Sequence, residues 1–185
     1  MIQVISLLVE NKPGALMRIT GVLTARAYNI ESLTVARTLD PTLSRMTIAV
    51  DVDPSLRSLL IKQMNRLLNV LHVHDATETH AVAREMVLMR VRAPLEKRTA
   101  VLKEAEIFGA RVIDSSLDGF ALEATGEPEK LDEFIDIMRS YGEFDIARSG
   151  LVAMSLKPTK PRLSPPVPTR AESKEQEERS GVLNG

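Results

Sequence analysis

The stretch ENKPGALMRITGVLTARAYNIESL, residues 10–33, decides how the first half of the chain folds. It opens on the turn-forming tetrapeptide NKPG, directly after an apolar and β-branched run at residues 2–9 that predicts a strand. Behind the turn, apolar residues recur at the spacing of one helical face, at Leu16, Ile19, Val22 and Leu23. Tyr28 and Asn29 end this pattern, so the stretch predicts a strand, a turn and an amphipathic helix.

The residues that follow predict the rest of a first folding unit. Residues 30–38 and 45–52 are rich in β-branched side chains and are separated by the turn sequence LDPTLS, so they predict two paired strands. The tripeptide DPS at residues 53–55 is typical of a helix start, and apolar residues from Leu56 to Leu71 line one face of the predicted helix. A strand is expected at residues 70–77. The predicted order of elements is βαββαβ.

The same order returns in the second half of the chain. Strands are predicted at residues 86–92, 111–116, 120–124 and 143–148, and helices at residues 95–108 and 129–141. Asp118 and Gly119 supply a hairpin dipeptide between the two middle strands. Each unit should form a four-stranded antiparallel sheet with both helices on one face. The other face of each sheet needs a cover, which the other half of the chain or a second chain could supply.

These patterns predict an α+β chain of two ferredoxin-like βαββαβ units, with domains at residues 1–80 and 81–156. Residues 158–168 hold five of the ten prolines, and a charged run follows them. Such a composition buries too little apolar surface to fold by itself. Residues 157–185 are therefore expected to form a disordered tail.

The composition excludes several classes of protein. The 24 basic and 25 acidic residues leave a net charge of -1, so no global field attracts nucleic acid or an anionic membrane. Charges interrupt the apolar runs well before the roughly 20 residues that a membrane span needs, and the N-terminus lacks the pattern of a signal peptide. The absence of cysteine removes disulfides and thiolate chemistry. A cytoplasmic protein without a membrane partner is expected.

No constellation of catalytic residues is visible. Ser115 and Ser116 have no histidine in their own repeat that could act as a base, and the chain has no cysteine nucleophile. His72 and His74 alternate along a predicted strand and His80 follows, which makes a metal site conceivable. However, no further ligand is spaced to complete a coordination shell. Neither a catalytic site nor a metal site is predicted.

The βαββαβ order is also that of RNA-recognition modules, whose first and third strands carry exposed aromatic residues for base stacking. Here those two strands read IQVISLLV and RMTIAVDV, and neither contains an aromatic residue. Aromatic residues make up only 3% of the chain, and tryptophan is absent. Nucleic acid is therefore not an expected partner.

The start of the first helix could bind a small anion. The free N–H groups of its first turn and the positive end of its dipole lie beside Gly14, where the missing side chain lets a ligand approach. A carboxylate fits there, and the side chains of Asn11 and Asn29 could meet an ammonium group. Pro13 and Gly14 are equally compatible with a plain turn, and Asn29 with a simple helix end. The residues alone leave both interpretations open.

A resemblance to a known family favours the binding site. The sequence LLVENKPGALMRITGVLTARAYNIESLTVARTLDPTLSRMTI, residues 7–48, resembles the small regulatory subunit of acetohydroxyacid synthase, also called acetolactate synthase. The first half of the chain looks like an ACT domain. The similarity continues through REMVLMRV at residues 84–91, EIFGARVID at residues 106–114 and ARSGLVAMS at residues 147–155. It therefore covers nearly everything before the tail.

The resemblance implies a protein without catalytic activity. It would bind the large catalytic subunit of acetolactate synthase, raise its activity, and confer feedback inhibition by a branched-chain amino acid, usually valine. Thiamine diphosphate, Mg²⁺ and FAD are expected on the catalytic subunit, and no cofactor is expected on this chain. ACT domains of the family pair across a homodimer and bind the effector at the seam. By resemblance, one chain would contribute Asn11, Gly14, Ala15 and Leu16, and the other Asn29 and Ile30.

Two features depart from the family pattern. Lys12 and Pro13 stand where many members carry an acidic and a small residue, and the proline-rich tail is an addition. Leucine differs from valine by one methylene, which is worth about 0.8 kcal/mol or roughly a factor of four in affinity. The sequence therefore does not choose between the branched-chain amino acids.

Overall fold

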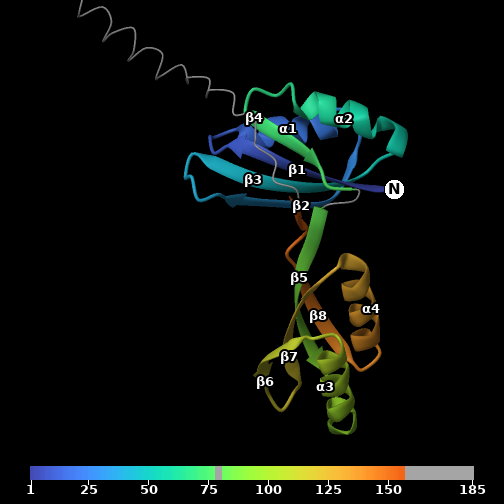
Figure 1. The fold of residues 1–185 in the computed structure, drawn as a ribbon. Helices are drawn as coiled ribbons and strands as arrows, with labels where there is room; N and C mark the ends of the chain where they lie inside the picture. The colour runs from blue at the N-terminus through green and yellow to red at the C-terminus, as the bar shows by residue number, and fades with distance from the viewer. Residues whose placement is uncertain (78–80, 157–185) are drawn as a thin grey trace, which may run out of the picture.

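The structure is a computed structural model, and it describes residues 1–77 and 81–156. Its first half forms a four-stranded antiparallel sheet in the order β2-β3-β1-β4. The strands are β1 (Ile2–Glu10), β2 (Asn29–Arg37), β3 (Leu43–Asp51) and β4 (Val70–Asp75). Helix α1 (Ala15–Thr24), a short 3₁₀ turn η1 (Pro54–Leu56) and helix α2 (Arg57–Met64) complete this unit. Both helices lie on one face of the sheet (Figure 1).

The first core lies between this sheet and its helices. Because side chains alternate along a strand, Ile5, Leu7 and Val9 of β1 point to the same face. They pack against Ile19 and Leu23 of α1, and all five side chains are at most 2% exposed. The 3.6-residue spacing of the quoted stretch therefore describes the buried face of α1.

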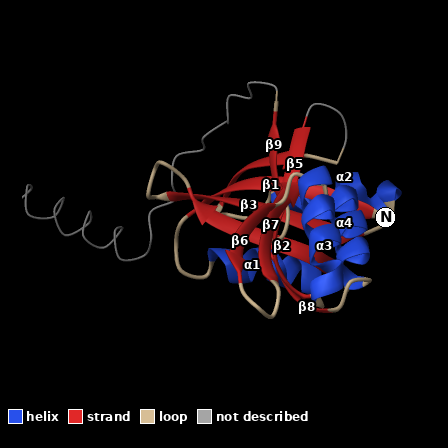
Figure 2. Cartoon of the chain, turned by 90° about the horizontal axis from the view of Figure 1, so that it is seen from below, coloured by secondary structure: helices blue, strands red, loops and turns tan. Residues whose placement is uncertain are grey.

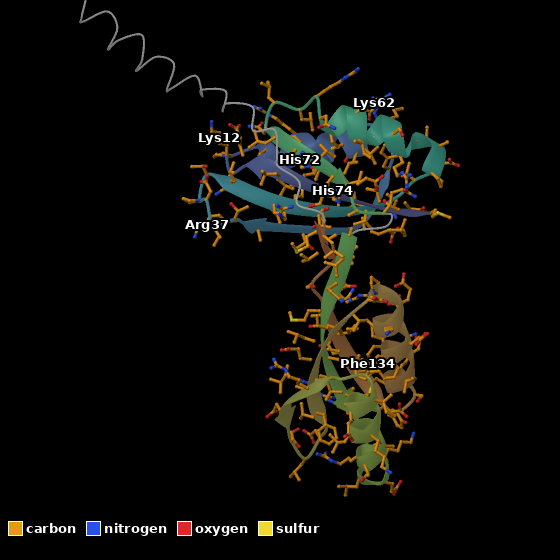
Figure 3. The ribbon with its side chains drawn as sticks, viewed as in Figure 1. Lys12, Arg37, Lys62, His72, His74 and Phe134 are labelled. Atoms are coloured by element: carbon orange, nitrogen blue, oxygen red, sulfur yellow. The ribbon has the colours of Figure 1, made fainter. Side chains whose placement is uncertain are left out.

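The second half repeats the arrangement, with the sheet order β6-β7-β5-β8. Its strands are β5 (Ala81–Arg92), β6 (Arg111–Ser115), β7 (Phe120–Gly126) and β8 (Glu143–Arg148). The turn η2 (Leu95–Lys97) leads into helix α3 (Arg98–Ile107), and helix α4 (Pro128–Arg139) lies beside it (Figure 2). Phe134 of α4 is fully buried at the centre of this core, 5.1 Å from the ring of Phe108 (Figure 3).

The predicted α+β fold of two ferredoxin-like units is confirmed, with three local differences. Helix α2 ends at Met64 although apolar residues continue to Leu71, because the chain must turn there to return as β4. Strand β5 begins at Ala81, five residues before the predicted start. A further strand, β9 (Val152–Ser155), pairs with the first part of β5 and was not predicted. The predicted tail lies outside the described residues.

The two-stranded ribbon of β9 and the start of β5 covers the face of the first sheet that the helices leave open. Ala153 of β9 and Leu151, which directly precedes this strand, are 1% and 6% exposed. The Ala153 N–H donates a hydrogen bond of 3.2 Å to Thr47 Oγ1, and the Leu151 N–H donates one of 3.3 Å to Ser32 Oγ. In addition, Thr34 Oγ1 donates to the Ser149 carbonyl over 3.3 Å. For this sheet, the cover comes from the second half of the same chain.

Replacing Thr47 by Val should destabilise this cover. The substitution leaves the buried Ala153 N–H without its acceptor, which costs about 1–3 kcal/mol of unfolding free energy. Thr34→Val is the matched control, because its hydroxyl makes an exposed contact and the expected loss is only about 0.5 kcal/mol. Urea unfolding of the full chain measures the free energy of unfolding of both variants. Equal stability of the two variants would show that the bond to Ala153 does not anchor the ribbon.

Candidate functional site

The candidate site begins where β1 turns into α1. Gly14 is the N-cap residue of α1 and has a φ of 81°, in the left-handed region that favours glycine. A Cβ atom built on Gly14 would meet no atom within 4 Å, so the backbone borders open space. No side chain caps the helix, and its first turn contains no acidic residue. The N–H groups of Leu16 and Met17 therefore have no helical acceptor and can bind an anion.

A buried polar network fixes the backbone just before this turn. The Glu10 carboxylate is 5% exposed and accepts a hydrogen bond of 2.7 Å from Asn69 Nδ2. Arg18 of α1 donates to Asn69 Oδ1 over 2.8 Å, and Lys12 pairs with Glu10 at 3.5 Å. The network ties the end of β1, the first helix and the residue before β4 together. Sequence patterns did not reveal it, because its members are 59 residues apart.

Asn69→Ala should weaken this anchor. It deprives the buried Glu10 carboxylate and the Arg18 guanidinium of a shared partner, at an expected cost of about 1–3 kcal/mol in unfolding free energy. Asn65→Ala is a suitable control, since the Asn65 side chain makes only an exposed bond to the Ile61 carbonyl. That variant should lose less than about 1 kcal/mol. Guanidinium unfolding compares them, and similar losses would mean that the network does not stabilise the turn.

The residues predicted beside Gly14 do lie at this end of the sheet. Asn11 is exposed, and its Nδ2 donates a hydrogen bond of 3.0 Å to the Pro41 carbonyl, which leaves Oδ1 able to accept. Ala15 is buried, at 4% exposed, and so contributes its backbone rather than its side chain. Leu16 and Met17 are 44% and 75% exposed. Met17, whose backbone N–H lies in the same first turn of α1, was not among the predicted residues.

Asn29 and Ile30 lie at the opposite end of the same sheet. Asn29 pairs with Asp51, which pairs with Ile2, whereas Gly14 follows Glu10 at the other end of β1. Asn29 and Arg37 are the two ends of the nine-residue strand β2, and eight steps of about 3.3 Å separate them by roughly 26 Å. Figure 3 shows Lys12 and Arg37 together at the Gly14 end. One chain therefore does not bring the two predicted groups together.

The negative charge of Glu31 lies beside Asn29, and the sequence analysis did not single it out. Asn29 Nδ2 donates a hydrogen bond to the carboxylate of Glu31, two residues later on β2. Its Oδ1 can still accept, and the carboxylate adds an attraction for a cation. Ile30 is half-buried and packs against the first core. Strand β2 pairs only with β3, so its other edge has no strand beside it within the described residues.

The sequence made a metal site at His72 and His74 conceivable. His72 and His74 lie on β4, facing the same side of the sheet as Leu8 and Ser6 of β1 (Figure 3). Burial, with smaller contributions from His74 and Arg45, lowers the pKa of His72 and so favours the neutral ring. No three His, Cys, Asp or Glu side chains in residues 1–77 and 81–156 are grouped to hold a metal ion. His80 lies outside these residues.

Both halves of the chain match known protein families. Residues 5–72 match the family described as the AHAS small subunit-like ACT domain, and residues 84–157 match the small subunit of acetolactate synthase. The probable acetolactate synthase small subunit of Archaeoglobus fulgidus is 48% identical over 150 residues, which cover 81% of this chain and 94% of the relative. The acetolactate synthase small subunit of Mycolicibacterium smegmatis is 40% identical over 154 residues, covering 83% and 91%.

A solved structure agrees with these matches. The crystal structure of the acetolactate synthase small subunit from Thermotoga maritima has a TM-score of 0.76 at 34% identity and covers 86% of this chain and 99% of that one. No helix in the described part of the chain is long and apolar enough to cross a membrane. Both halves, in the same order and over nearly the full length of the relatives, match one kind of protein. The chain belongs to the acetolactate synthase small-subunit family.

Proposed function

We propose that this chain is a regulatory subunit that activates the catalytic subunit of acetolactate synthase and makes it sensitive to a branched-chain amino acid, with valine as the expected effector. The supporting observation is the uncapped start of α1 beside Gly14, which offers N–H groups to a carboxylate. In this proposal residues 1–80 bind the effector and dimerise, and residues 81–156 communicate with the catalytic subunit. Thiamine diphosphate, Mg²⁺ and FAD are assigned to that subunit, not to this chain.

The strand register supports an effector site shared by two chains. The unpaired edge of β2 can accept a second β2 in antiparallel orientation, which is the pairing that a twofold axis produces. Antiparallel pairing brings the Asn29 end of one strand to the Arg37 end of the other. That end is also where Gly14 lies in the second chain. Two residue groups that are roughly 26 Å apart in one chain thus approach each other across the seam.

Each part of an amino acid then has a matching group. The N–H groups of Leu16 and Met17 receive the carboxylate, and Asn29 Oδ1 with Glu31 of the other chain receives the ammonium group. Each charge-assisted bond is worth about 1.5–3 kcal/mol, and burial of the valine side chain adds about the same. After the cost of association, binding in the micromolar to millimolar range follows. Such affinities suit the sensing of a metabolite pool.

Titration of valine, leucine and isoleucine into the reconstituted complex tests the proposal. With acetolactate formation as the readout, a regulatory subunit raises the rate and confers inhibition by at least one of the three. A purely structural partner would raise the rate and leave it insensitive to amino acids. An enzyme in its own right would turn over substrate without the catalytic subunit. Either of the last two results would replace the proposed function.

Asn29→Ala should weaken effector binding without loss of activation. The variant removes one polar partner of the effector, which costs about 1–3 kcal/mol, or roughly five- to 150-fold in affinity. Asn65→Ala, also exposed and placed at the end of α2, should bind the effector as the wild type does. Calorimetric titration of each full-length variant gives the affinities. Unchanged affinity of Asn29→Ala for all three amino acids would exclude Asn29 from the site.

A further inference from the structure

The connector, residues 148–151, joins β8 of the second sheet to β9 of the ribbon. Its first residue, Arg148, pairs with the buried Glu85 of β5 over 2.6 Å. The Met86 N–H donates a hydrogen bond of 3.0 Å to Ser149 Oγ, and the Ser149 N–H donates one of 2.9 Å to the Met86 carbonyl. The second sheet therefore holds the start of the connector through side chains and backbone together.

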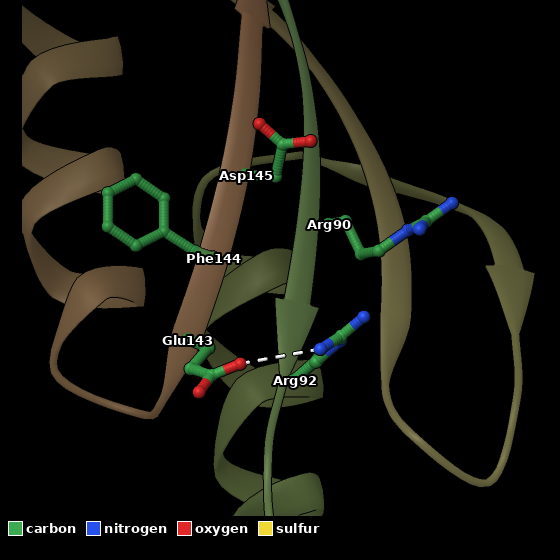
Figure 4. A pocket seen from close by; sticks show the side chains of 5 residues that line it. All are labelled: Arg90, Arg92, Glu143, Phe144 and Asp145. Carbon is green, nitrogen blue, oxygen red and sulfur yellow. Dashed lines mark hydrogen bonds and ion pairs between the residues drawn. The ribbon is translucent and has the colours of Figure 1, made fainter.

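The far end of the same two strands is held differently. Strand register places Arg92 of β5 beside Glu143 of β8, and their ion pair spans 3.4 Å (Figure 4). These side chains are 59% and 83% exposed, whereas the Glu85 side chain is 7% exposed. Water and salt screen exposed charges, so the Arg92–Glu143 pair joins the strands only weakly. The strong ion pair between β5 and β8 is the one at the connector.

The remainder of the connector lies against strand β2 of the first sheet. Thr34 Oγ1 donates a hydrogen bond of 3.3 Å to the Ser149 carbonyl, and the Leu151 N–H donates one of 3.3 Å to Ser32 Oγ. Gly150 lies between these two bonds and has a φ of 76°. A Cβ atom built on Gly150 would lie 2.9 Å from Thr34 Oγ1, so the contact there is tight. The connector thus links β2 to the second sheet.

Strand β2 is irregular just before this contact. Ile30 and Ser32 pair with successive residues of β3, so Glu31 is the extra residue of a β-bulge. A bulge disrupts the ladder locally and bends its strand. Asn29 and Glu31 are the groups proposed to receive the ammonium group of the effector, and Ser32 directly follows them. A shift of the bulge therefore reaches Ser32, and through it the Leu151 N–H.

We propose that the connector transmits effector binding from β2 to the second half of the chain, and so to the catalytic subunit. This inference rests on the proposed function. Leu151 is only 6% exposed, so a shift of Ser32 away from it would leave a buried N–H unpaired. That cost favours a joint movement of β2 and the connector, which Arg148 passes on to β5. A cavity of about 500 Å³ beside Glu31 and Arg148 leaves room for the movement.

Gly150→Ala should uncouple inhibition from effector binding. The new methyl group would lie too close to Thr34 Oγ1, and the positive φ is strained for alanine, so the connector must move away from β2. Rates of the reconstituted complex are measured at saturating valine, leucine or isoleucine, whichever inhibits the wild type. The inhibited fraction of the rate should fall by at least about half. Calorimetry on the variant chain should find an effector affinity within about twofold of the wild type.

Two control variants and a second test variant accompany it. Gly109→Ala carries the same strain, because Gly109 has a φ of 66°, but its Cβ position is open. Arg92→Met breaks the exposed pair at the far end of β5 and β8 (Figure 4). Both controls should keep full inhibition and wild-type effector affinity. Ser32→Ala removes the acceptor of the Leu151 N–H without backbone strain, and it should also reduce inhibition at unchanged affinity. Melting temperatures check that each variant folds.

The possible results distinguish this inference from the proposed function. Full inhibition in both Gly150→Ala and Ser32→Ala, at wild-type effector affinity, would overturn the inference and leave the proposed function intact. Loss of effector binding in both variants would also overturn it, because the connector would then shape the site rather than transmit its occupancy. A wild-type complex that none of the three amino acids inhibits would overturn the proposed function, and the inference with it.

Discussion

Gly14→Asp is expected to abolish feedback inhibition while the chain still activates the catalytic subunit. The new side chain occupies the open space beside Gly14, and its negative charge lies where the proposal puts the effector carboxylate. Loss of two charge-assisted bonds and added repulsion should weaken effector binding by more than about 100-fold. Rate measurements on the reconstituted complex over a range of valine concentrations show the effect.

Two controls separate the causes of this loss. Gly109 also has a positive φ, 66°, with no atom within 4 Å of a built Cβ, so Gly109→Asp carries the same backbone strain far from the site. It should keep wild-type sensitivity to the effector. Gly14→Asn has nearly the size of the Asp variant without the charge, so the difference between the two isolates the electrostatic part. If Gly14→Asp keeps full sensitivity, the effector binds elsewhere.

Arg148→Met is expected to cause the largest loss of stability among the ion pairs of the described residues. Arg148 donates to both carboxylate oxygens of Glu85, over 3.0 and 2.6 Å, and to Asp132 over 2.6 Å. The hydrogen bonds to Glu85 raise the pKa of Arg148 further, so its charge is permanent. The Glu85 side chain is only 7% exposed, and its unpaired charge would cost about 3–5 kcal/mol. Because Arg148 is 38% exposed, about 3 kcal/mol is expected.

Matched variants show whether the burial of Glu85 causes the expected loss of stability in Arg148→Met. Arg111 pairs with Glu123 at 2.7 Å, but the Arg111 side chain is 76% exposed, so Arg111→Met should lose less than about 1 kcal/mol. Adding Glu85→Gln to Arg148→Met removes the stranded charge and should recover part of the stability. Chemical unfolding of the full chain measures the free energy of unfolding of Arg148→Met, Arg111→Met and the double variant. A loss below about 1 kcal/mol for Arg148→Met would mean that water reaches Glu85 freely.

Most of the fold could be predicted because its elements carry their own periodic patterns. The helical spacing from Leu16 to Leu23 and the alternation along β1 depend on local residues alone. Strand β9 has four residues, too few for a pattern, and forms because β5 extends far enough to pair with it. The length of α2 was predicted too long because apolar residues in a turn resemble those of a helix. Contacts between segments that are distant in the sequence therefore determined both the formation of β9 and the end of α2.

Some residues of the candidate site could likewise be predicted from the sequence, and others could not. Gly14 could be found because a glycine between a strand and a helix has a local conformational reason. The Glu10–Asn69 network could not, since its members are 59 residues apart in the sequence. Glu31 was missed for another reason, because it lies only two residues from Asn29 but belongs to no motif that marks it. The wide separation of Gly14 and Asn29 in one chain also required the strand register. It is this separation that makes a site between two chains the central claim.

Effector binding by a mixed dimer tests that claim most directly. A Gly14→Asp chain and an Asn29→Ala chain, carrying different purification tags, are combined, and the mixed dimer is isolated. One of its seams then holds both native residues and the other holds neither. Calorimetry should find one effector site of wild-type affinity per mixed dimer, against two in the wild-type dimer, and none in the Gly14→Asp dimer. A mixed dimer without any site of native affinity would contradict a site shared between chains.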